Sequence, residues 1–181
     1  MDKLMEILGK YDGIIGTLLG VALTMSLTEY LKRLGKLKFY ITQKEVTFKV
    51  KRKNEHRETI LEVTDDKEVA NFLLVDVLIE IYNSSDTPNI LRDVKLSLYD
   101  NNQCKLSVIP EDKTTEKFMS AAYHREEFRH INIKPKEIIA LHLVYYFNKE
   151  QVDEIKNCNK LFLESRGSDG KRHKVLVDEL G

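Results

Sequence analysis

The sequence contains no tryptophan, only three prolines and only two cysteines, Cys104 and Cys158. Two cysteines cannot build the multi-bridge framework of a small secreted domain, and these two do not stand in the CxxC spacing of zinc or redox motifs. Basic and acidic residues balance at 29 each, so the chain lacks the basic excess typical of nucleic-acid-binding domains. Its 181 residues, 42% of them hydrophobic, suit one folded domain. We therefore expect a reducing compartment and no nucleic-acid partner.

No sequence motif points to a particular reaction. The chain contains neither GxSxG nor HExxH, and Gly167–Lys171 resembles a phosphate-binding loop only superficially, so we interpret it as a hairpin turn. An enzyme or small-molecule sensor would need a site assembled from loops, which a single sequence can hide. The first candidates for such a site are His124, Glu127, His130 and Glu137.

Three of these candidates, His124, Glu127 and His130, lie together in the segment HREEFRH. The neighbouring Arg125 and Arg129 oppose a bound cation, and metal ligation also needs neutral imidazoles held by further hydrogen-bond partners. We therefore expect no metal site, no catalytic residue and no cofactor, and keep the three residues only as candidates for an unidentified ligand.

One uncharged stretch, Gly13–Thr28, differs from the rest of the chain. Its 16 residues would make a helix of about 24 Å, against roughly 30 Å for the hydrocarbon core of a bilayer. Tyr11 and Tyr30 can place their rings at the two interfaces, so the helix is long enough when it is counted from ring to ring. Its hydroxyl groups can bond back to the helix's own carbonyls. The stretch is therefore predicted to be a transmembrane anchor.

Other interpretations of this stretch remain open. A soluble β-sandwich could dock it on a sheet, although such a helix usually keeps one polar face. A cleaved signal peptide begins with a positive region, whereas here Asp2, Glu6 and Asp12 accompany Lys3 and Lys10. A helix lying in the membrane interface needs a charged face, which the stretch lacks.

Basic residues around the stretch predict its orientation, because Lys and Arg resist translocation out of the cytoplasm. Only Lys3 and Lys10 precede it. The juxtamembrane basic residues that follow it are Lys32, Arg33, Lys36 and Lys38. The large domain is therefore predicted to be cytoplasmic at the cell membrane, with the N-terminus outside.

Small residues recur along the same stretch at intervals of four. Gly16 and Gly20 form a GxxxG pattern, which Thr24 and Thr28 continue. Such a row allows close approach of a second helix, from another copy or from a different membrane protein. Glycine is also simply frequent in membrane helices, so the pattern alone does not decide between these interpretations.

From Gly35 onward the hydrophobic period changes from helical to two. Val75, Val77, Ile79 and Ile81, for example, alternate with Asp76 and Glu80, which is typical of a strand with one face on a core. The predicted strands cover residues 37–42, 46–50, 59–63, 75–81, 94–98, 105–109, 130–133, 139–147, 160–164 and 174–177. Eight to ten short strands are enough for two packed sheets.

Two further stretches are predicted to be short connecting helices, Thr114–Glu127 and Lys149–Asn157. Turn-forming residues separate the strands at Asn83–Pro88, Asp100–Asn102 and Gly167–Gly170. Because no long helices alternate with the strands, the pattern favours an antiparallel sandwich over a parallel α/β sheet.

Several segments resemble bacterial single-pass membrane proteins of unassigned function that carry an immunoglobulin-like sandwich. The resemblance lies in LKRLGKLKFYI, LIEIYNSSDTPNILRDVKLSLYDNN and INIKPKEIIALHLVYYF. It implies a fold but no activity. The chain lacks the tryptophan and the Cys…Trp…Cys arrangement of true immunoglobulin domains.

The sequence as a whole predicts a mainly β fold: an antiparallel immunoglobulin-like β-sandwich in residues 36–181, one or two short connecting helices, and an N-terminal transmembrane helix in residues 1–35. It predicts a non-enzymatic binding or scaffolding protein that presents its sandwich to a protein partner or self-associates through the helix. The alternatives are an enzyme or sensor with a site built from loops, and a soluble sandwich with a docked helix.

A second group of basic residues follows the juxtamembrane group in the sequence: Lys49, Lys51, Arg52, Lys53 and Arg57. If this hairpin hung beside the bilayer, both groups could face anionic lipid headgroups. A solvated hairpin of mixed charge explains the same residues equally well.

Overall fold

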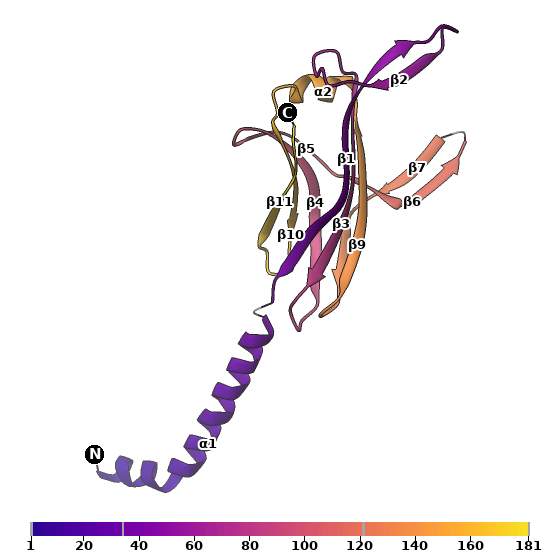
Figure 1. The fold of residues 1–181 in the computed structure, drawn as a ribbon. Coiled ribbons are helices and arrows are strands. Elements are labelled where there is room, and N and C mark those ends of the chain that lie inside the picture. Colours follow the sequence, from indigo (N-terminus) through magenta and orange to yellow (C-terminus); the bar gives the residue numbers. More distant parts are fainter. Residues whose placement is uncertain (1, 34, 121, 181) are drawn as a thin grey trace.

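The computed structural model describes the backbone of residues 2–33, 35–120 and 122–180, and their side chains apart from those of residues 2–12, 15 and 31–33. Helix α1 (Asp2–Arg33) comes first, and every strand follows it. A second helix, α2 (Lys149–Ile155), lies at the end of the strands away from α1 (Figure 1). α1 itself extends away from the strands.

The strands of the described chain form two antiparallel sheets. The six-stranded sheet has the order β2-β1-β3-β9-β6-β7 and contains β1 (Leu37–Lys53), β2 (Thr59–Val63), β3 (Phe72–Asn83), β6 (Glu111–Met119), β7 (Ala122–Glu127) and β9 (Ile138–Phe147). The five-stranded sheet has the order β11-β10-β4-β5, with β8 also paired to β4, and contains β4 (Asn89–Asp100), β5 (Gln103–Val108), β8 (His130–Ile133), β10 (Lys160–Arg166) and β11 (Arg172–Glu179). This arrangement confirms the predicted antiparallel sandwich.

The core lies between the inner faces of the two sheets (Figure 1). Val77 and Ile79 on β3 are fully buried, as are Leu96 on β4 and Leu161 on β10. Burying each such side chain contributes about 1.5–3 kcal/mol. The alternating apolar residues therefore supply most of the free energy that holds the sheets together.

β1 is one long strand, although the sequence predicts two separate segments. It pairs with β3 from Leu37 to Lys49, with a register shift between Ile41 and Gln43. One extra residue changes which positions face inward, because side chains alternate along a strand. Odd-numbered Ile41 and even-numbered Phe48 therefore both pack against the core.

The segment Thr114–Glu127 is the main error of the sequence analysis, because it forms the β6–β7 hairpin and not a helix. Phe118 faces Tyr123 across the two strands, with ring centroids 5.1 Å apart. Ser120 takes a left-handed conformation (φ 52°) at the turn between them. Cross-strand pairing thus outweighs the helical preference of the alanines, lysines and glutamates in this segment.

The second predicted connecting helix is confirmed as α2. Asn148 caps its N-terminus by accepting a hydrogen bond from the Gln151 backbone, and the Gln151 side chain accepts one from the Asn148 backbone. This reciprocal pair satisfies two amide groups that the first helical turn leaves free. Val152 and Ile155 anchor the helix in the core.

The junction between α1 and β1 lies against the loop that joins β3 to β4. A Cβ atom added at Gly35 would stand 2.0 Å from the Cα of Ser85. Next to it, the Lys36 backbone donates a hydrogen bond to Ser84 Oγ (2.9 Å) and accepts bonds from the backbone and the hydroxyl of Ser84. Only glycine fits this close approach of two backbones.

Candidate interaction surfaces

The predicted anchor stretch lies in α1, and every described side chain of α1 is exposed to solvent. The exposed fractions of Leu18 (64%), Leu23 (69%) and Met25 (69%) show that these side chains are not covered by any described part of the chain. The docked arrangement considered from the sequence is therefore not the one in the structure. No helix within the described residues meets the length and apolarity that crossing a membrane demands.

The hydroxyl groups of this helix are satisfied by the helix itself. Thr17, Thr24, Ser26 and Thr28 each donate to the carbonyl oxygen four residues earlier, at 2.7–2.8 Å. This bonding confirms the pattern expected from the sequence. A hydroxyl that is already hydrogen-bonded costs less free energy to transfer into an apolar environment, so these serine and threonine side chains do not prevent the helix from facing such an environment.

The predicted packing row is exposed along one side of α1. A Cβ added at Gly16 or Gly20 would meet nothing within 4 Å, and Thr24 and Thr28 turn their hydroxyls back to the helix. The row is thus open to an approaching helix, and its role in association stays a prediction.

Two of the predicted juxtamembrane basic residues, Lys36 and Lys38, are exposed where α1 joins the sandwich. The other two, Lys32 and Arg33, lie outside the residues whose side chains are described. Lys136, in the β8–β9 turn, reaches the same end of the sandwich and binds the Ser84 carbonyl (2.7 Å) and Asp86 (3.2 Å).

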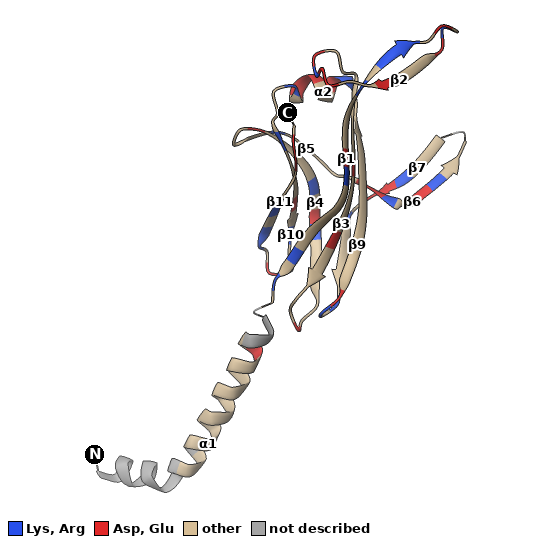
Figure 2. Ribbon diagram, viewed as in Figure 1, with Lys and Arg blue, Asp and Glu red and all other residues tan. Residues whose placement is uncertain are grey.

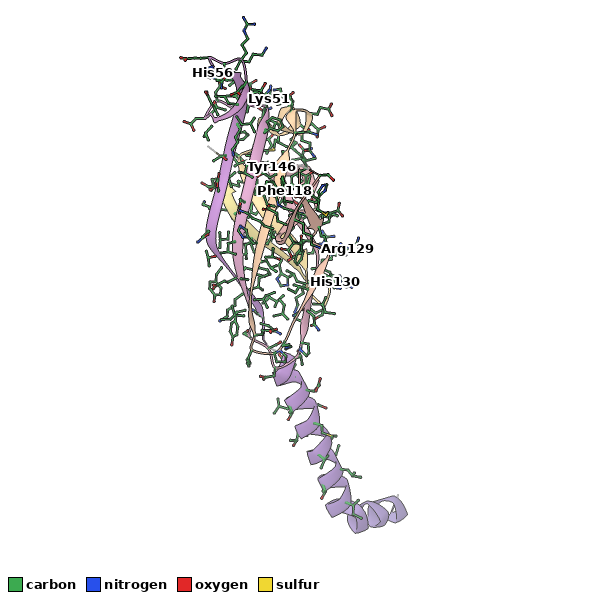
Figure 3. The ribbon with its side chains drawn as sticks, turned by 90° about the vertical axis from the view of Figure 1, so that its right-hand side faces the viewer. Lys51, His56, Phe118, Arg129, His130 and Tyr146 are labelled. Carbon is green, nitrogen blue, oxygen red and sulfur yellow. The ribbon has the colours of Figure 1, made fainter. Side chains whose placement is uncertain are left out.

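The structure separates the predicted ligand residues. His124 pairs with Lys117 in the β6–β7 hairpin, Glu127 ends β7, and His130 begins β8 in the other sheet. Figure 3 shows His130 nearer α1 than Phe118 of the hairpin. The described residues contain no group of three side chains able to hold a metal ion.

The fourth candidate, Glu137, has a structural role: its carboxylate accepts the Lys134 backbone N–H (2.7 Å) in the turn before β9. The positions of these four residues therefore do not support a ligand site that they would form together.

An open groove of about 730 Å³ lies on the five-stranded sheet. At its floor, Glu164 accepts hydrogen bonds from Tyr99 (2.7 Å) and from Ser97 (3.1 Å). The Lys174 ammonium lies 3.4 Å from the Tyr99 ring centroid. The bond to Glu164, together with burial, raises the pKa of Tyr99, so the phenol stays protonated. The Tyr99, Ser97, Glu164 and Lys174 side chains thus satisfy one another.

A second polar group lies on the outer face of the six-stranded sheet. Asp76 accepts hydrogen bonds from Lys113 and from His142 (2.6 Å). Burial favours the neutral acid, but the two bonds and their charges outweigh it and lower the pKa of Asp76. The sequence analysis missed this group because its members are far apart along the chain.

The β6–β7 hairpin, which projects from the edge of the six-stranded sheet, presents exposed aromatic residues near its tip (Figure 1). Phe118 and Tyr123 are 67% and 63% exposed. Arg125 lies 5.7 Å from the Tyr146 ring centroid and is held by Glu116 and Glu111. Aromatic and arginine side chains are enriched where proteins bind one another, so this hairpin is a candidate contact surface.

The basic residues after Phe48 form a projecting ribbon, residues 49–63, which we call the β1–β2 arm. The arm lies at the end of the sandwich opposite α1 (Figure 2). Figure 3 shows Lys51 and His56 at that end. Since β1 runs the length of the sandwich, about 50 Å separates the arm's tip from Lys36 and Lys38. The two basic groups thus lie at opposite ends of the sandwich, and a lipid-facing role of the hairpin stays a prediction.

Comparison with known proteins places this architecture in a family. The model of the YopI Ig-like domain matches residues 35–178, from the junction with α1 to the last residue but one of β11. The chain belongs to the YopI Ig-like domain family. The YopI domain match thus includes both sheets, the groove and the β1–β2 arm.

A YopI relative matches over the full length. The SPbeta prophage-derived uncharacterized protein YopI of Bacillus subtilis strain 168 is 38% identical over 180 residues, which are 99% of each chain. This similarity extends through α1 as well as the YopI domain.

Two solved structures show more distant likeness to the YopI domain. A β-sandwich protein from Clostridium difficile 630 has a TM-score of 0.32 and 13% identity, covering 79% of this chain and 86% of its own. A conserved hypothetical protein from Bacillus anthracis has a TM-score of 0.31 and 14% identity, covering 77% and 87%.

Proposed function

We propose that this protein is a non-enzymatic binding or scaffolding protein, anchored in the cell membrane by α1, that presents its immunoglobulin-like sandwich to a protein partner on the cytoplasmic side. The observation that carries the proposal is the exposure of large apolar side chains all along the described part of α1, with Leu18, Leu23 and Met25 as examples. Exposed apolar surface of this extent marks a membrane or protein contact.

The charge distribution supports an anchor. From Gly13 to Thr28 the helix carries no charge, and its hydroxyls are bonded internally. Tyr30 is 62% exposed at the sandwich end of the stretch, where an aromatic ring suits the boundary between lipid and water. Lys36 and Lys38 lie just beyond it, where they can meet anionic headgroups.

The anchor is tested by fractionating cells that express the full chain and washing the membranes with carbonate. The wild-type chain is expected in the pellet. The double variant Leu18→Lys/Leu23→Lys is expected in the supernatant, because a lysine at the middle of a membrane helix costs about 2.5–3.5 kcal/mol.

The matched control is Ile138→Lys, which places a lysine at an exposed apolar residue of the sandwich (63% exposed) and should stay in the pellet. Recovery of the wild-type chain in the supernatant would overturn the proposal.

Orientation is tested with the chain's own cysteines. Cys104 is exposed on the sandwich, whereas burial of Cys158 raises the pKa of its thiol to about 11 and slows its reaction. A membrane-impermeant maleimide should label Cys104 only after the cells are opened. Labelling in intact cells would place the sandwich outside and contradict the cytoplasmic orientation.

A further inference from the structure

The two faces of the β1–β2 arm differ in charge. Residues opposite one another in an antiparallel pair share a face, and the register pairs Lys49 with Val63, Lys51 with Leu61 and Lys53 with Thr59. No carboxylate stands on this face. We call these six residues the basic face.

On the opposite face of the arm, the positive and negative charges compensate each other. Val50 stands opposite Glu62, and Arg52 stands opposite Ile60. Arg52 pairs with Glu62 at 3.3 Å. Lys49 and Lys53, by contrast, form no ion pair with any described residue, and the Lys51 ammonium lies 4.9 Å from the Phe72 ring centroid. The unbalanced charge of the arm is therefore concentrated on its basic face.

Apolar side chains lie among these lysines. Leu61 and Val63 are 54% and 65% exposed. Beyond Lys49, β3 no longer pairs with β1, so the arm continues as a two-stranded ribbon with both faces open. Such ribbons are marginally stable in water, and exposed apolar residues on one are better explained by a partner than by stability.

The arm also has a free edge. β2 is the last strand of its sheet and pairs only with β1, so its outer backbone groups are open to another strand. An extended segment laid beside β2 would lie about 10 Å from β1, two strand spacings away. Lysine and glutamate side chains together span that distance across Leu61 and Val63.

The tip of the arm is preorganised. The Asn54 side chain accepts hydrogen bonds from the backbones of His56 (3.0 Å) and Glu58 (2.8 Å) and donates one to the Glu58 carboxylate (2.9 Å). At the base, Asn71 accepts the Lys51 backbone N–H (2.7 Å). A ribbon held at both ends loses little conformational entropy when it binds.

From these observations we infer that the β1–β2 arm binds an extended acidic segment of a partner protein, in which carboxylates and apolar side chains follow one another at every second position and so share one face of the strand. The segment adds a strand at the β2 edge. Its carboxylates reach the lysines of the basic face, while its apolar side chains cover Leu61 and Val63. The inference rests on the proposed role in binding a protein partner and names the chemistry of that partner.

The mixture of groups favours a peptide over other anions. Phosphate-rich ligands need cations but gain nothing from Leu61 and Val63, and the arm lies at the end of the sandwich opposite α1 (Figure 2). Pairing along β2 supplies main-chain hydrogen bonds, and the side chains of the basic face supply selectivity for acidic residues.

The test uses the full chain in neutral detergent and a fluorescein-labelled twelve-residue peptide of three Glu-Ser-Val-Ser repeats, in which glutamate and valine share one face of an extended strand. Binding is measured by fluorescence anisotropy, and contacts are mapped from backbone amide NMR shifts. The peptide should bind, shift the amides of Thr59–Val63, and bind less tightly as salt is raised. A peptide with lysine in place of glutamate should not bind.

The decisive variant is Lys51→Glu/Lys53→Glu, which should weaken binding of the glutamate peptide about tenfold because two attractions become repulsions. Lys95→Glu/Arg172→Glu reverses two exposed charges on the other sheet, changes the net charge equally, and should leave the affinity unchanged. Leu61→Ser should also weaken binding while leaving the charge of the face intact.

Three results would overturn the inference: equal binding by wild type and Lys51→Glu/Lys53→Glu, equal binding of the lysine peptide, or displacement of the peptide by an oligonucleotide or phosphatidylserine nanodiscs at lower concentration than by unlabelled peptide. The arm variants should remain in the carbonate-washed membrane pellet. A result that refutes peptide binding by the arm can thereby be distinguished from one that refutes membrane anchoring by α1.

Discussion

The junction between α1 and the sandwich offers a sharp test of the structure through Gly35→Ala. The added Cβ would lie 2.0 Å from the Cα, 2.2 Å from the backbone nitrogen and 2.4 Å from the Cβ of Ser85. Backbone atoms on both sides leave no flexible side chain to move. The two segments must therefore separate by about an ångström or more.

That separation would lower the free energy of unfolding of the sandwich. It would break the three hydrogen bonds between Lys36 and Ser84, which have lengths of 2.8–3.1 Å. At about 1 kcal/mol each, their loss destabilises the sandwich by about 2–3 kcal/mol. For a chain of this size the expected fall in Tm is about 5–10 °C.

The assay is thermal unfolding followed by circular dichroism, together with hydrogen exchange of the Lys36 and Ser84 amides. Gly20→Ala is the matched control, because its Cβ meets nothing within 4 Å and alanine favours a helix. The control should unfold no earlier than wild type. If Gly35→Ala kept both the wild-type Tm and slow exchange at Ser84, the close approach at Gly35 would be wrong.

Two further predictions concern α1 and the six-stranded sheet. Asp76→Asn should destabilise the fold by about 1–3 kcal/mol in urea unfolding at neutral pH, because Lys113 and His142 lose a charged acceptor. The pKa of Asp76 is lowered in the folded state, so the ionised carboxylate stabilises the fold above the ordinary carboxyl pKa, and this stabilisation is lost as the pH falls through the pKa of the folded state. The free energy of unfolding of Asp76→Asn should therefore fall less on acidification than that of wild type. Parallel pH profiles of the two proteins would contradict this. Gly16→Leu/Gly20→Leu should weaken self-association of the detergent-solubilised chain in sedimentation equilibrium, whereas Gly13→Leu should not; a wild-type chain that stays monomeric would remove the packing row from consideration.

Much of the sandwich could be predicted from the sequence because alternation is a local signal. Val75, Val77, Ile79 and Ile81 reveal the inner face of β3 without knowledge of its neighbours, and the turn residues at Gly167–Gly170 mark a hairpin. The capped helix α2 was equally visible, since its acidic first turn and apolar positions lie within a few residues.

The errors arose where distant or cross-strand contacts decide the structure. Thr114–Glu127 contains good helix formers, but the pairing of Phe118 with Tyr123 and the bonding of Arg125 to Glu116 form only in a hairpin. Likewise, the extra residue between Ile41 and Gln43 hides the continuity of β1.

The candidate surfaces were even harder to predict from the sequence. The sequence gives the lysines near residue 50 but not the register that places three of them opposite Thr59, Leu61 and Val63. Nor can composition show that this hairpin lies far from α1. His124 and His130 are close in sequence but belong to different sheets, so proximity along the chain suggested a cluster that the fold does not make.

The length of β1 has a mechanical consequence. Its first residue follows the junction with α1, and its last residue lies in the arm, so one continuous backbone connects the proposed anchor to the proposed partner site. A strand is already near the full extension that its covalent geometry allows. Tension between the membrane and a partner strand added at β2 would therefore pass through the β1–β2 pair and then along the covalent bonds of β1, without having to shear or unzip the hydrogen bonds between the other strands of the sandwich.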